Sequence, residues 1–336
     1  MERPDARHAP VGATYHGTVT SRPQPGTGGE TVVRVEHLVK RYGTVDAVRG
    51  IDFEIRRGEV FGFLGPNGAG KSTTIRCLVG LLRPTAGRVT AFGLDTWTDG
   101  VAARRHIAYL PGELRLPDRL TTLDLVATVG RMRGGFDVPR REALAERLQL
   151  DVHRQLRDLS SGNRRKVALL LAFLADADLL VLDEPTTGLD PLIQHEFLAL
   201  VRDARAEGAT VFLSSHVLSE VQRAADRVAV LHAGRVIAVG TVAELRGRPR
   251  QRIEAWFDAA PPVAELLALP GVADATVDGL RFSATLAGPV QPLVDLLARH
   301  PVTSMRVEDP DLDDAVMALY AAHSGDAGAG TAGQRP

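Results

Sequence analysis

Short apolar runs alternate with amphipathic stretches over residues 30–248. Apolar and polar positions alternate around Val48, Ile51, Phe53 and Ile55, which is typical of a half-buried strand. Three largely apolar runs predict buried strands: Glu59–Leu64, Leu179–Leu182 and Thr210–Ser214. Helical patterns lie between them, in a stretch that starts at Lys71 and stops before Pro84 and at Thr122–Met132, Arg165–Phe173 and Leu192–Arg205. This alternation predicts an α/β fold with a mainly parallel sheet covered on both faces.

The pattern of apolar and polar positions changes after residue 248. Over residues 249–323 the pattern predicts strand, helix, strand, strand, helix, strand and a last helix. The segments are Arg252–Phe257, Pro262–Ala268, Ala273–Val277, Arg281–Leu286, Val290–Arg299, Thr303–Val307 and Leu312–Ala321. That order matches the ferredoxin-like βαββαβ arrangement, so we expect a small α+β C-terminal accessory domain.

Three segments lack apolar periodicity. Residues 1–29 and 324–336 are rich in glycine, proline or alanine, and we expect both to be disordered tails. The segment Arg246–Arg252 is polar and broken by a proline, which favours a linker between the two ordered parts.

Composition narrows the class of protein. The 336 residues carry a net charge of −1, which argues against a generally basic nucleic-acid binder. The longest unbroken apolar run, Val167–Ala175, is far shorter than the roughly 20 residues of a membrane-spanning helix. Cys77 is the only cysteine, which excludes an intramolecular disulfide and a cysteine-based zinc site. Residues 1–20 carry no secretion signal, so we expect a cytoplasmic protein.

A glycine-rich segment between a predicted strand and a predicted helix fits the pattern GxxxxGK[ST]. Its residues are Gly65, Pro66, Asn67, Gly68, Ala69, Gly70, Lys71 and Ser72, and Thr73 follows. Glycines let backbone N–H groups curl around phosphate oxygens, and the helix directs its positive end at the same anion. Lys71 can reach the β- and γ-phosphates, and the Ser72 hydroxyl can bind Mg²⁺. The alternative is a glycine turn without a ligand.

Two carboxylates follow the apolar strand Leu179–Leu182. Asp183 is placed to hold Mg²⁺ through water, and Glu184 is placed to act as the general base toward an attacking water. The alternative is a solvated Asp–Glu pair at a strand end. A phosphate loop in the same predicted sheet favours the catalytic interpretation.

A short motif before a predicted helix, Leu159–Asn163, reads LSSGN and precedes the acidic strand. Together with the two sites above, it makes the sequence resemble the ATP-binding subunits of ABC transporters, in which this motif is usually LSGGQ. Ser161 stands in place of a glycine here, and Asn163 in place of the glutamine. The resemblance implies that Ser160, Ser161 and Gly162 bind the γ-phosphate of an ATP held by a second subunit.

Further family motifs appear in the family's order over residues 32–245. Gly188–Pro191 resembles the D-loop, which places Asp190 at the dimer contact. His216 resembles the switch histidine that contacts the γ-phosphate and is expected to be catalytic together with Glu184 and Lys71. The resemblance also implies that Tyr42 stacks on adenine.

One motif departs from the family pattern. The family has a glutamine that touches Mg²⁺ and the attacking water, but this chain has Gly112 followed by Glu113. Two outcomes are open: Glu113 reaches the site by a one-residue shift, or the contact is absent.

The resemblance implies a P-loop NTPase of the ABC ATPase type, with an antiparallel β region beside the mainly parallel sheet. The ATP-binding domain would span residues 30–248, with a helical subdomain at about 116–160 that docks on a membrane partner. ATP and Mg²⁺ are the implied cofactors, and ATP hydrolysis would energise an exporter of the drug- and antibiotic-resistance class. We expect two partners, a separate transmembrane permease subunit and a second, identical ATP-binding subunit, and no nucleic acid. The chain itself would lie in the cytoplasm, peripheral on the cytoplasmic face of the cell membrane.

The sequence leaves two other functions to compare with a transporter subunit. Soluble ABC-type ATPases that act on nucleic acid or ribosomes usually carry two ATP modules, long coiled coils or cysteine-rich zinc modules, none of which the sequence predicts. A nucleotide-binding regulator without turnover is indicated only by Gly112 and the altered signature. Glu184 and His216 favour hydrolysis over that alternative.

Overall fold

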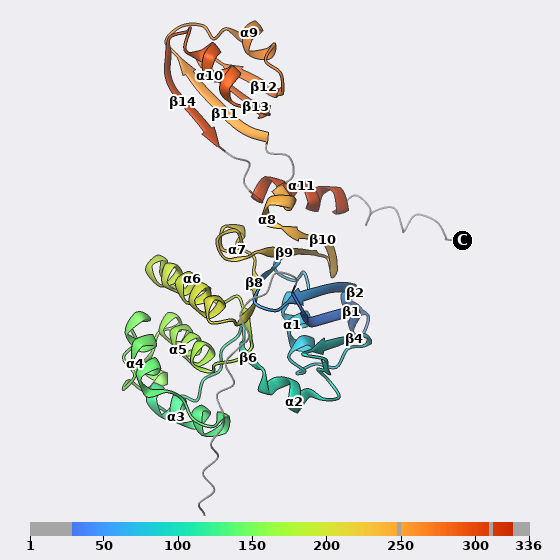
Figure 1. Ribbon diagram of the computed structural model, residues 1–336, viewed down its shortest axis with the longest axis vertical. Coiled ribbons are helices and arrows are strands. Elements are labelled where there is room, and N and C mark those ends of the chain that lie inside the picture. Colours follow the sequence, from blue (N-terminus) through green and yellow to red (C-terminus); the bar gives the residue numbers. More distant parts are fainter. Residues whose placement is uncertain (1–28, 247–249, 309–311, 325–336) are drawn as a thin grey trace, which may run out of the picture.

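The computed structural model describes residues 29–246, 250–308 and 312–324 (Figure 1). The expected tails, residues 1–29 and 324–336, lie outside this part of the chain except for Gly29 and Ser324. Ser324 ends the last helix. In the described ranges, no helix has the length and apolar character needed to cross a membrane.

A six-stranded sheet forms the centre of the N-terminal unit, in the order β10-β9-β3-β8-β7-β6. The strands are β3 (Val60–Leu64), β6 (Ile107–Leu110), β7 (Leu179–Asp183), β8 (Thr210–Ser215), β9 (Arg227–His232) and β10 (Arg235–Thr241). All neighbours are parallel except β9 and β10. Every residue of β3, β7 and β8 is buried, because layers on both faces exclude water. The predicted mainly parallel sheet is confirmed.

An antiparallel sheet in the order β2-β1-β4-β5 forms a second layer. Its strands are β1 (Thr31–Tyr42), β2 (Val45–Arg56), β4 (Ala86–Ala91) and β5 (Leu94–Asp95). The Phe53 ring of β2 lies with its centroid 5.4–6.1 Å from those of Phe61, Phe63 and Phe212 in the central sheet. Helix α1 (Lys71–Leu78) adds Cys77 to this core, where burial raises the pKa of the thiol to about 11. Cys77 is therefore a packing residue.

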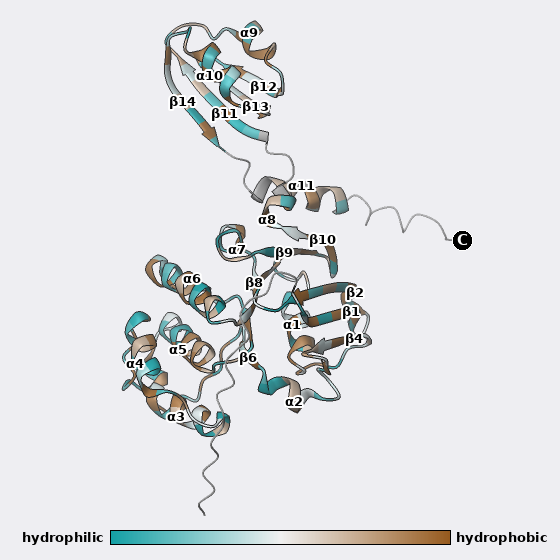
Figure 2. Ribbon diagram, viewed as in Figure 1, coloured by the Kyte–Doolittle hydropathy of each residue, from teal (hydrophilic) through white to brown (hydrophobic). Residues whose placement is uncertain are grey.

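Four helices gather on the side of the central sheet away from the antiparallel sheet (Figure 1). They are α3 (Thr122–Arg133), α4 (Val138–Arg147), α5 (Ser161–Leu174) and α6 (Pro191–Ala206). Each starts at a side chain that accepts a backbone hydrogen bond from the first turn: Thr121, Asp137, Ser160 and Asp190. Figure 2 shows hydrophilic and hydrophobic residues on the same helical ribbons, the amphipathic pattern that packs one face on the core.

The shorter elements connect these layers. Helix α2 (Gly100–Arg105) precedes β6, the 3-10 helix η1 (Leu156–Asp158) precedes α5, and α7 (Leu218–Ala224) follows β8. Helix α8 (Val242–Arg246) follows β10.

The C-terminal unit has the expected βαββαβ order. Its elements are β11 (Arg250–Phe257), α9 (Val263–Leu267), β12 (Val272–Asp278), β13 (Arg281–Ala287), α10 (Gln291–Leu297) and β14 (Val302–Glu308). The strands form one antiparallel sheet in the order β12-β13-β11-β14, which confirms the ferredoxin-like prediction. Of the linker expected at Arg246–Arg252, residues 247–249 lie outside the described residues, and Arg246 ends α8. The prediction is wrong for residues 250–252, which pair with β13 in β11. Their polar side chains misled the prediction because one face of this sheet is open to water.

Helix α11 (Leu312–Ser324) packs away from the sheet that precedes it. It contacts α7, α8 and β10 of the N-terminal unit, as Figure 1 shows at α8. Val316 is fully buried in a cluster with Leu218, Val221 and Val228, and the Tyr320 ring lies 5.0 Å from that of His232. The chain therefore leaves the N-terminal unit after α8 and returns to it through α11.

Val316→Asp should destabilise the protein if α11 is docked in solution. A buried charge without a partner costs about 3 kcal/mol or more, whereas surface substitutions usually stay within about 0.5 kcal/mol. Met317, which is 62 % exposed on the same helix, provides the matched control Met317→Asp. Thermal unfolding should show a midpoint several degrees lower for Val316→Asp only. Equal midpoints for the two variants would contradict the docking.

Candidate functional site

The glycine-rich loop joins β3 to α1 and lines a cavity of about 210 Å³. Gly68 and Gly70 have φ values of +80° and +107°, which residues with a Cβ rarely adopt. A Cβ at Gly70 would also lie 2.5 Å from the carbonyl oxygen of Ala47. The cavity is lined by Ala47, Pro66, Asn67, Gly68, Gly70, Lys71, Ser72, Thr73 and Glu184. Gly65 and Ala69, also predicted here, are buried.

The side chain of Lys71 is held in place by backbone carbonyl groups of the loop. Its buried Nζ donates hydrogen bonds to the carbonyl oxygens of Gly65 at 2.6 Å and Pro66 at 3.2 Å. The same Nζ lies 3.1 Å from Oε1 of Glu184, forming an ion pair. A phosphate group that binds Lys71 would therefore compete with Glu184 for the cation.

Asp183 lies at the end of β7 and is 1 % exposed. Its Oδ1 accepts a hydrogen bond of 2.7 Å from Oγ of Ser214, its register partner on β8. Asp183 and Ser72 offer carboxylate and hydroxyl oxygens, the donor type that Mg²⁺ prefers, so this pair fits the metal. Within the described ranges, no group of three or more His, Cys, Asp or Glu side chains could hold a metal. Phosphate and water oxygens would have to complete a magnesium site here.

Glu184 has a strained backbone and two charged neighbours. Its φ is +49°, in the left-handed region, and its N–H points at the carbonyl oxygen and Oγ of Ser214 at 3.2 and 3.1 Å. Oε2 lies 2.6 Å from Nδ1 of His216, which follows β8, and Oε1 pairs with Lys71. The structure thus brings the three residues predicted to be catalytic into one chain of contacts.

A buried carboxylate that the sequence analysis missed supports this arrangement. Glu220 of α7 accepts hydrogen bonds from Oγ1 of Thr186 at 2.6 Å and from Oγ of Ser215 at 2.8 Å. Thr186 lies two residues after Glu184, and Ser215 immediately precedes His216. Glu220 therefore links the two loops that carry Glu184 and His216. The only sequence signal is an acidic residue four positions after the histidine.

Gly112 occupies the position next to Asp183. A Cβ at Gly112 would lie 3.2 Å from Oδ2 of Asp183, so the backbone itself approaches the carboxylate. Glu113 is exposed at the protein surface. Of the two outcomes left open by the sequence, this geometry favours the absence of a side-chain contact from this loop.

The predicted signature residues lie at the start of α5, apart from the phosphate cavity. Ser160 caps the helix by accepting from the N–H of Asn163 at 3.2 Å, and both Ser160 and Ser161 are exposed. A Cβ at Gly162 would lie 2.9 Å from the carbonyl oxygen of Gly188, which explains the glycine. None of the three predicted signature residues belongs to the described lining of the phosphate cavity.

Two further predicted residues, Asp190 and Tyr42, are not in the described lining of the phosphate cavity. Asp190 is exposed and caps α6 by accepting from the N–H of Ile193 at 3.0 Å. Tyr42 ends β1 with 45 % of its surface exposed, and Nζ of Lys40 lies 5.2 Å from the ring centroid. An exposed aromatic ring with a cation nearby offers a stacking surface for a base.

Comparison with known proteins gives three kinds of match. The family model described as "ABC transporter" matches residues 48–187. The daunorubicin resistance ATP-binding protein DrrA3 of Streptomyces coeruleorubidus is 35% identical over 303 residues, 86% of this chain and 96% of that protein. The Nod factor export ATP-binding protein I of Ralstonia nicotianae is 36% identical over 256 residues, 73% of this chain and 79% of that protein.

A solved structure described as the ATP binding subunit of an ABC transporter matches with a TM-score of 0.60. It is 32% identical, and the match covers 64% of this chain and 92% of that one.

Proposed function

The chain belongs to the ATP-binding subunits of ABC transporters, and from this premise we propose that it hydrolyses ATP to drive a membrane exporter. The observation that carries the proposal is the contact chain of Lys71, Glu184 and His216 at the phosphate cavity. The relatives named for drug resistance and for Nod factor export support export as the direction of transport.

We assign phosphate binding to the loop Gly65–Thr73. Its glycines open the backbone N–H groups to phosphate oxygens, and Lys71 supplies the cation. Ser72 and Asp183 would hold Mg²⁺, which neutralises charge on the phosphates when it is bound. Ser214 keeps Asp183 oriented through the 2.7 Å hydrogen bond.

Glu184 would take the proton from the attacking water. A carboxylate is suited to this step because it accepts the proton as the oxygen attacks the γ-phosphorus and the bond to the leaving ADP oxygen breaks. His216, 2.6 Å from Glu184, would orient that carboxylate and contact the γ-phosphate. Binding of a phosphate group to Lys71 would release Oε1 of Glu184 from its ion pair, so that this oxygen can accept a proton from the water.

We further propose that two copies of the chain complete each ATP site. Ser160, Ser161 and Gly162 lie outside the described lining of the phosphate cavity, so in this proposal they serve the ATP of the second copy. Exposed Ser160 and the exposed Asp190 cap are accessible for such a contact. ATP would bind the closed pair better than the open one and shift that equilibrium.

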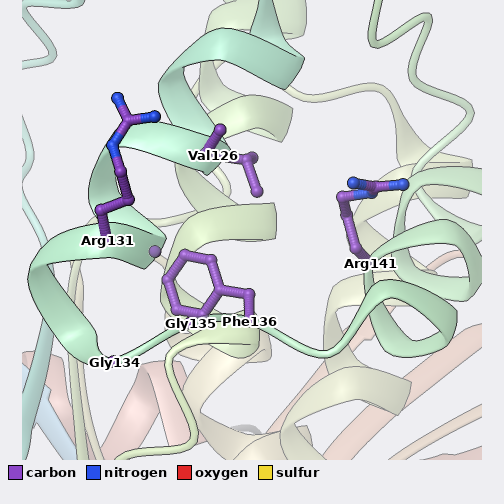
Figure 3. Close-up of a pocket in the computed structure, with 8 residues that line it drawn as sticks. Val126, Arg131, Gly134, Gly135, Phe136 and Arg141 are labelled. Carbon is purple, nitrogen blue, oxygen red and sulfur yellow. The ribbon is translucent and has the colours of Figure 1, made fainter. Parts of the chain in front are cut away.

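The permease would dock on the helical subdomain. A cavity of about 490 Å³ opens between α3 and α4, lined by Val126, Ala127, Gly130, Arg131, Gly134, Gly135, Phe136 and Arg141. Figure 3 shows the Phe136 ring and Val126 in this pocket, with Arg131 and Arg141 on its two sides. An apolar floor with arginines at its rim suits a partner segment with an apolar anchor and acidic neighbours. This docking would place the subunit at the cytoplasmic face of the membrane.

Co-purification tests the proposed transporter. Tagged Glu184→Gln protein should recover a multi-span membrane protein from detergent-solubilised native membranes in the presence of ATP and Mg²⁺, at one copy for every one or two ATPase subunits. Phe136→Asp, which places a charge in the pocket, should reduce that recovery. Recovery of ribosomal or DNA-bound proteins without any membrane protein would contradict the proposal and favour the soluble ATPase alternative.

Tyr42→Ala should weaken ATP binding by roughly 5- to 150-fold, because stacking a base on an aromatic ring contributes about 1–3 kcal/mol. Tyr42→Phe keeps the ring and should bind ATP within about twofold of the parent chain. Equilibrium binding of ATP and of inorganic triphosphate separates a loss of base stacking from a loss of phosphate binding, since only ATP carries a base. Equal losses for both ligands would contradict the adenine assignment.

A further inference from the structure

Arg165 is a buried arginine that joins two distant parts of the site. It lies in α5, three residues after Gly162, and is 6 % exposed. Its Nη1 donates to the carbonyl oxygen of Pro111 at 2.8 Å, and its Nη2 donates to that of Gly112 at 2.7 Å. The planar guanidinium thus holds two consecutive carbonyls of the loop after β6 with two separate nitrogens.

The loop that Arg165 holds is the one that approaches Asp183. Gly112 lies so close that a Cβ there would be 3.2 Å from Oδ2 of Asp183. Burial lowers the pKa of the Arg165 guanidinium, and the charges of Asp183 and Glu184 act in the opposite direction. The cation is therefore within electrostatic reach of both carboxylates. Burying a charge is costly unless hydrogen bonds satisfy it, so the two short bonds to this loop help to compensate its burial.

The same helix begins at the signature residues. Ser160 caps α5, and Gly162 packs against the carbonyl oxygen of Gly188. Arg165 lies three positions after Gly162, less than one turn of a rigid α-helix. A shift of the helix start must consequently move the guanidinium and the two carbonyls bonded to it.

We propose that Arg165 is a positioning residue that holds the Gly112 loop against Asp183 and couples this loop to the signature end of α5. The inference rests on the proposed function, because it assumes that Ser160–Gly162 contact the ATP of a second copy. Through Arg165, the ATP bound by one copy would set the loop beside the metal site of the other. The backbone of Gly112, held from α5, takes the place of a side-chain link from this loop.

Steady-state kinetics of the full chain with ATP and Mg²⁺ give the first test. Arg165→Ala should lower kcat at least tenfold and change the KM for ATP less than threefold, since the residue does not line the phosphate cavity. Arg165→Lys should restore only part of kcat, because an ammonium cannot reproduce the planar two-nitrogen contact. Arg164→Ala is the matched control: this neighbour makes a surface ion pair with Asp118 at 3.4 Å and should keep kcat within twofold.

Limited trypsin digestion gives a second readout that needs no hydrolysis of ATP. Arg115 is exposed and lies three residues beyond Gly112. Loss of the two hydrogen bonds should speed cleavage after Arg115 at least fivefold in Arg165→Ala, and less in Arg165→Lys, at a temperature well below the thermal unfolding midpoint of every variant. Should Arg165→Ala fail to fold, the Arg165→Lys comparison carries the test alone.

The inference is overturned if cleavage after Arg115 proceeds at the parent rate in both Arg165 variants, or if kcat and KM stay at parent values. A parent chain that binds ATP without hydrolysing it would instead contradict the proposed function. The cleavage result would still decide whether Arg165 holds the loop, so the two failures are distinguishable.

Discussion

Replacing Glu184 with glutamine should lower the rate of ATP hydrolysis by at least about a hundredfold, the usual contribution of a positioned general base. Glutamine keeps the size of the side chain but cannot accept the proton from water. The pairing of Glu184 with Lys71 at 3.1 Å and with His216 at 2.6 Å depends on the carboxylate, so both contacts should weaken. ATP binding should persist, because Lys71 then remains available to phosphate.

Steady-state phosphate release and equilibrium ATP binding measure the two halves of this expectation. Glu113→Gln is a matched control, since it makes the same chemical change at an exposed carboxylate near the site and should keep the rate within twofold. Light scattering with ATP should show Glu184→Gln as a dimer, because the closed pair can no longer be opened by hydrolysis. Retention of the parent rate would contradict the general-base role, and a monomer with ATP bound would contradict dimerisation of the isolated chain.

Much of the fold could be predicted from local patterns. The buried strands β3, β7 and β8 are marked by apolar runs because both faces of the sheet are covered. The P-loop NTPase fold of the ABC ATPase type and the ferredoxin-like C-terminal order are confirmed by the structure and its relatives. The start of β11 at Arg250 was missed, because strands with one solvated face can carry polar residues.

Residues of the site could be predicted from the sequence where they belong to a contiguous motif. The contact of Lys71, Glu184 and His216 joins residues up to 145 positions apart, but each belongs to a recognisable segment. Glu220 and Arg165 were not identified, since their partners depend on tertiary packing that no spacing encodes. The docking of α11 beside α7 was missed for the same reason, because the amphipathic pattern of a helix does not indicate which surface its apolar face packs against.

Lys71→Ala should weaken ATP binding by roughly 10- to 150-fold, since a hydrogen bond to a charged group contributes about 1.5–3 kcal/mol. Two effects contribute to the weaker ATP binding. The phosphates lose a cation that Gly65 and Pro66 hold at the cavity, and the Glu184 carboxylate loses the partner that offsets its charge. Equilibrium binding of ATP measures the sum.

A double-mutant cycle separates the two effects of removing Lys71. In the Glu184→Gln background the unpaired carboxylate is gone, so Lys71→Ala should cost less ATP affinity than it does in the parent chain. The difference reports the repulsion between Glu184 and phosphate, which the ion pair of 3.1 Å otherwise suppresses. Equal losses in both backgrounds would show that Lys71 and Glu184 act independently on ATP. Unchanged binding in Lys71→Ala itself would remove Lys71 from the phosphate site.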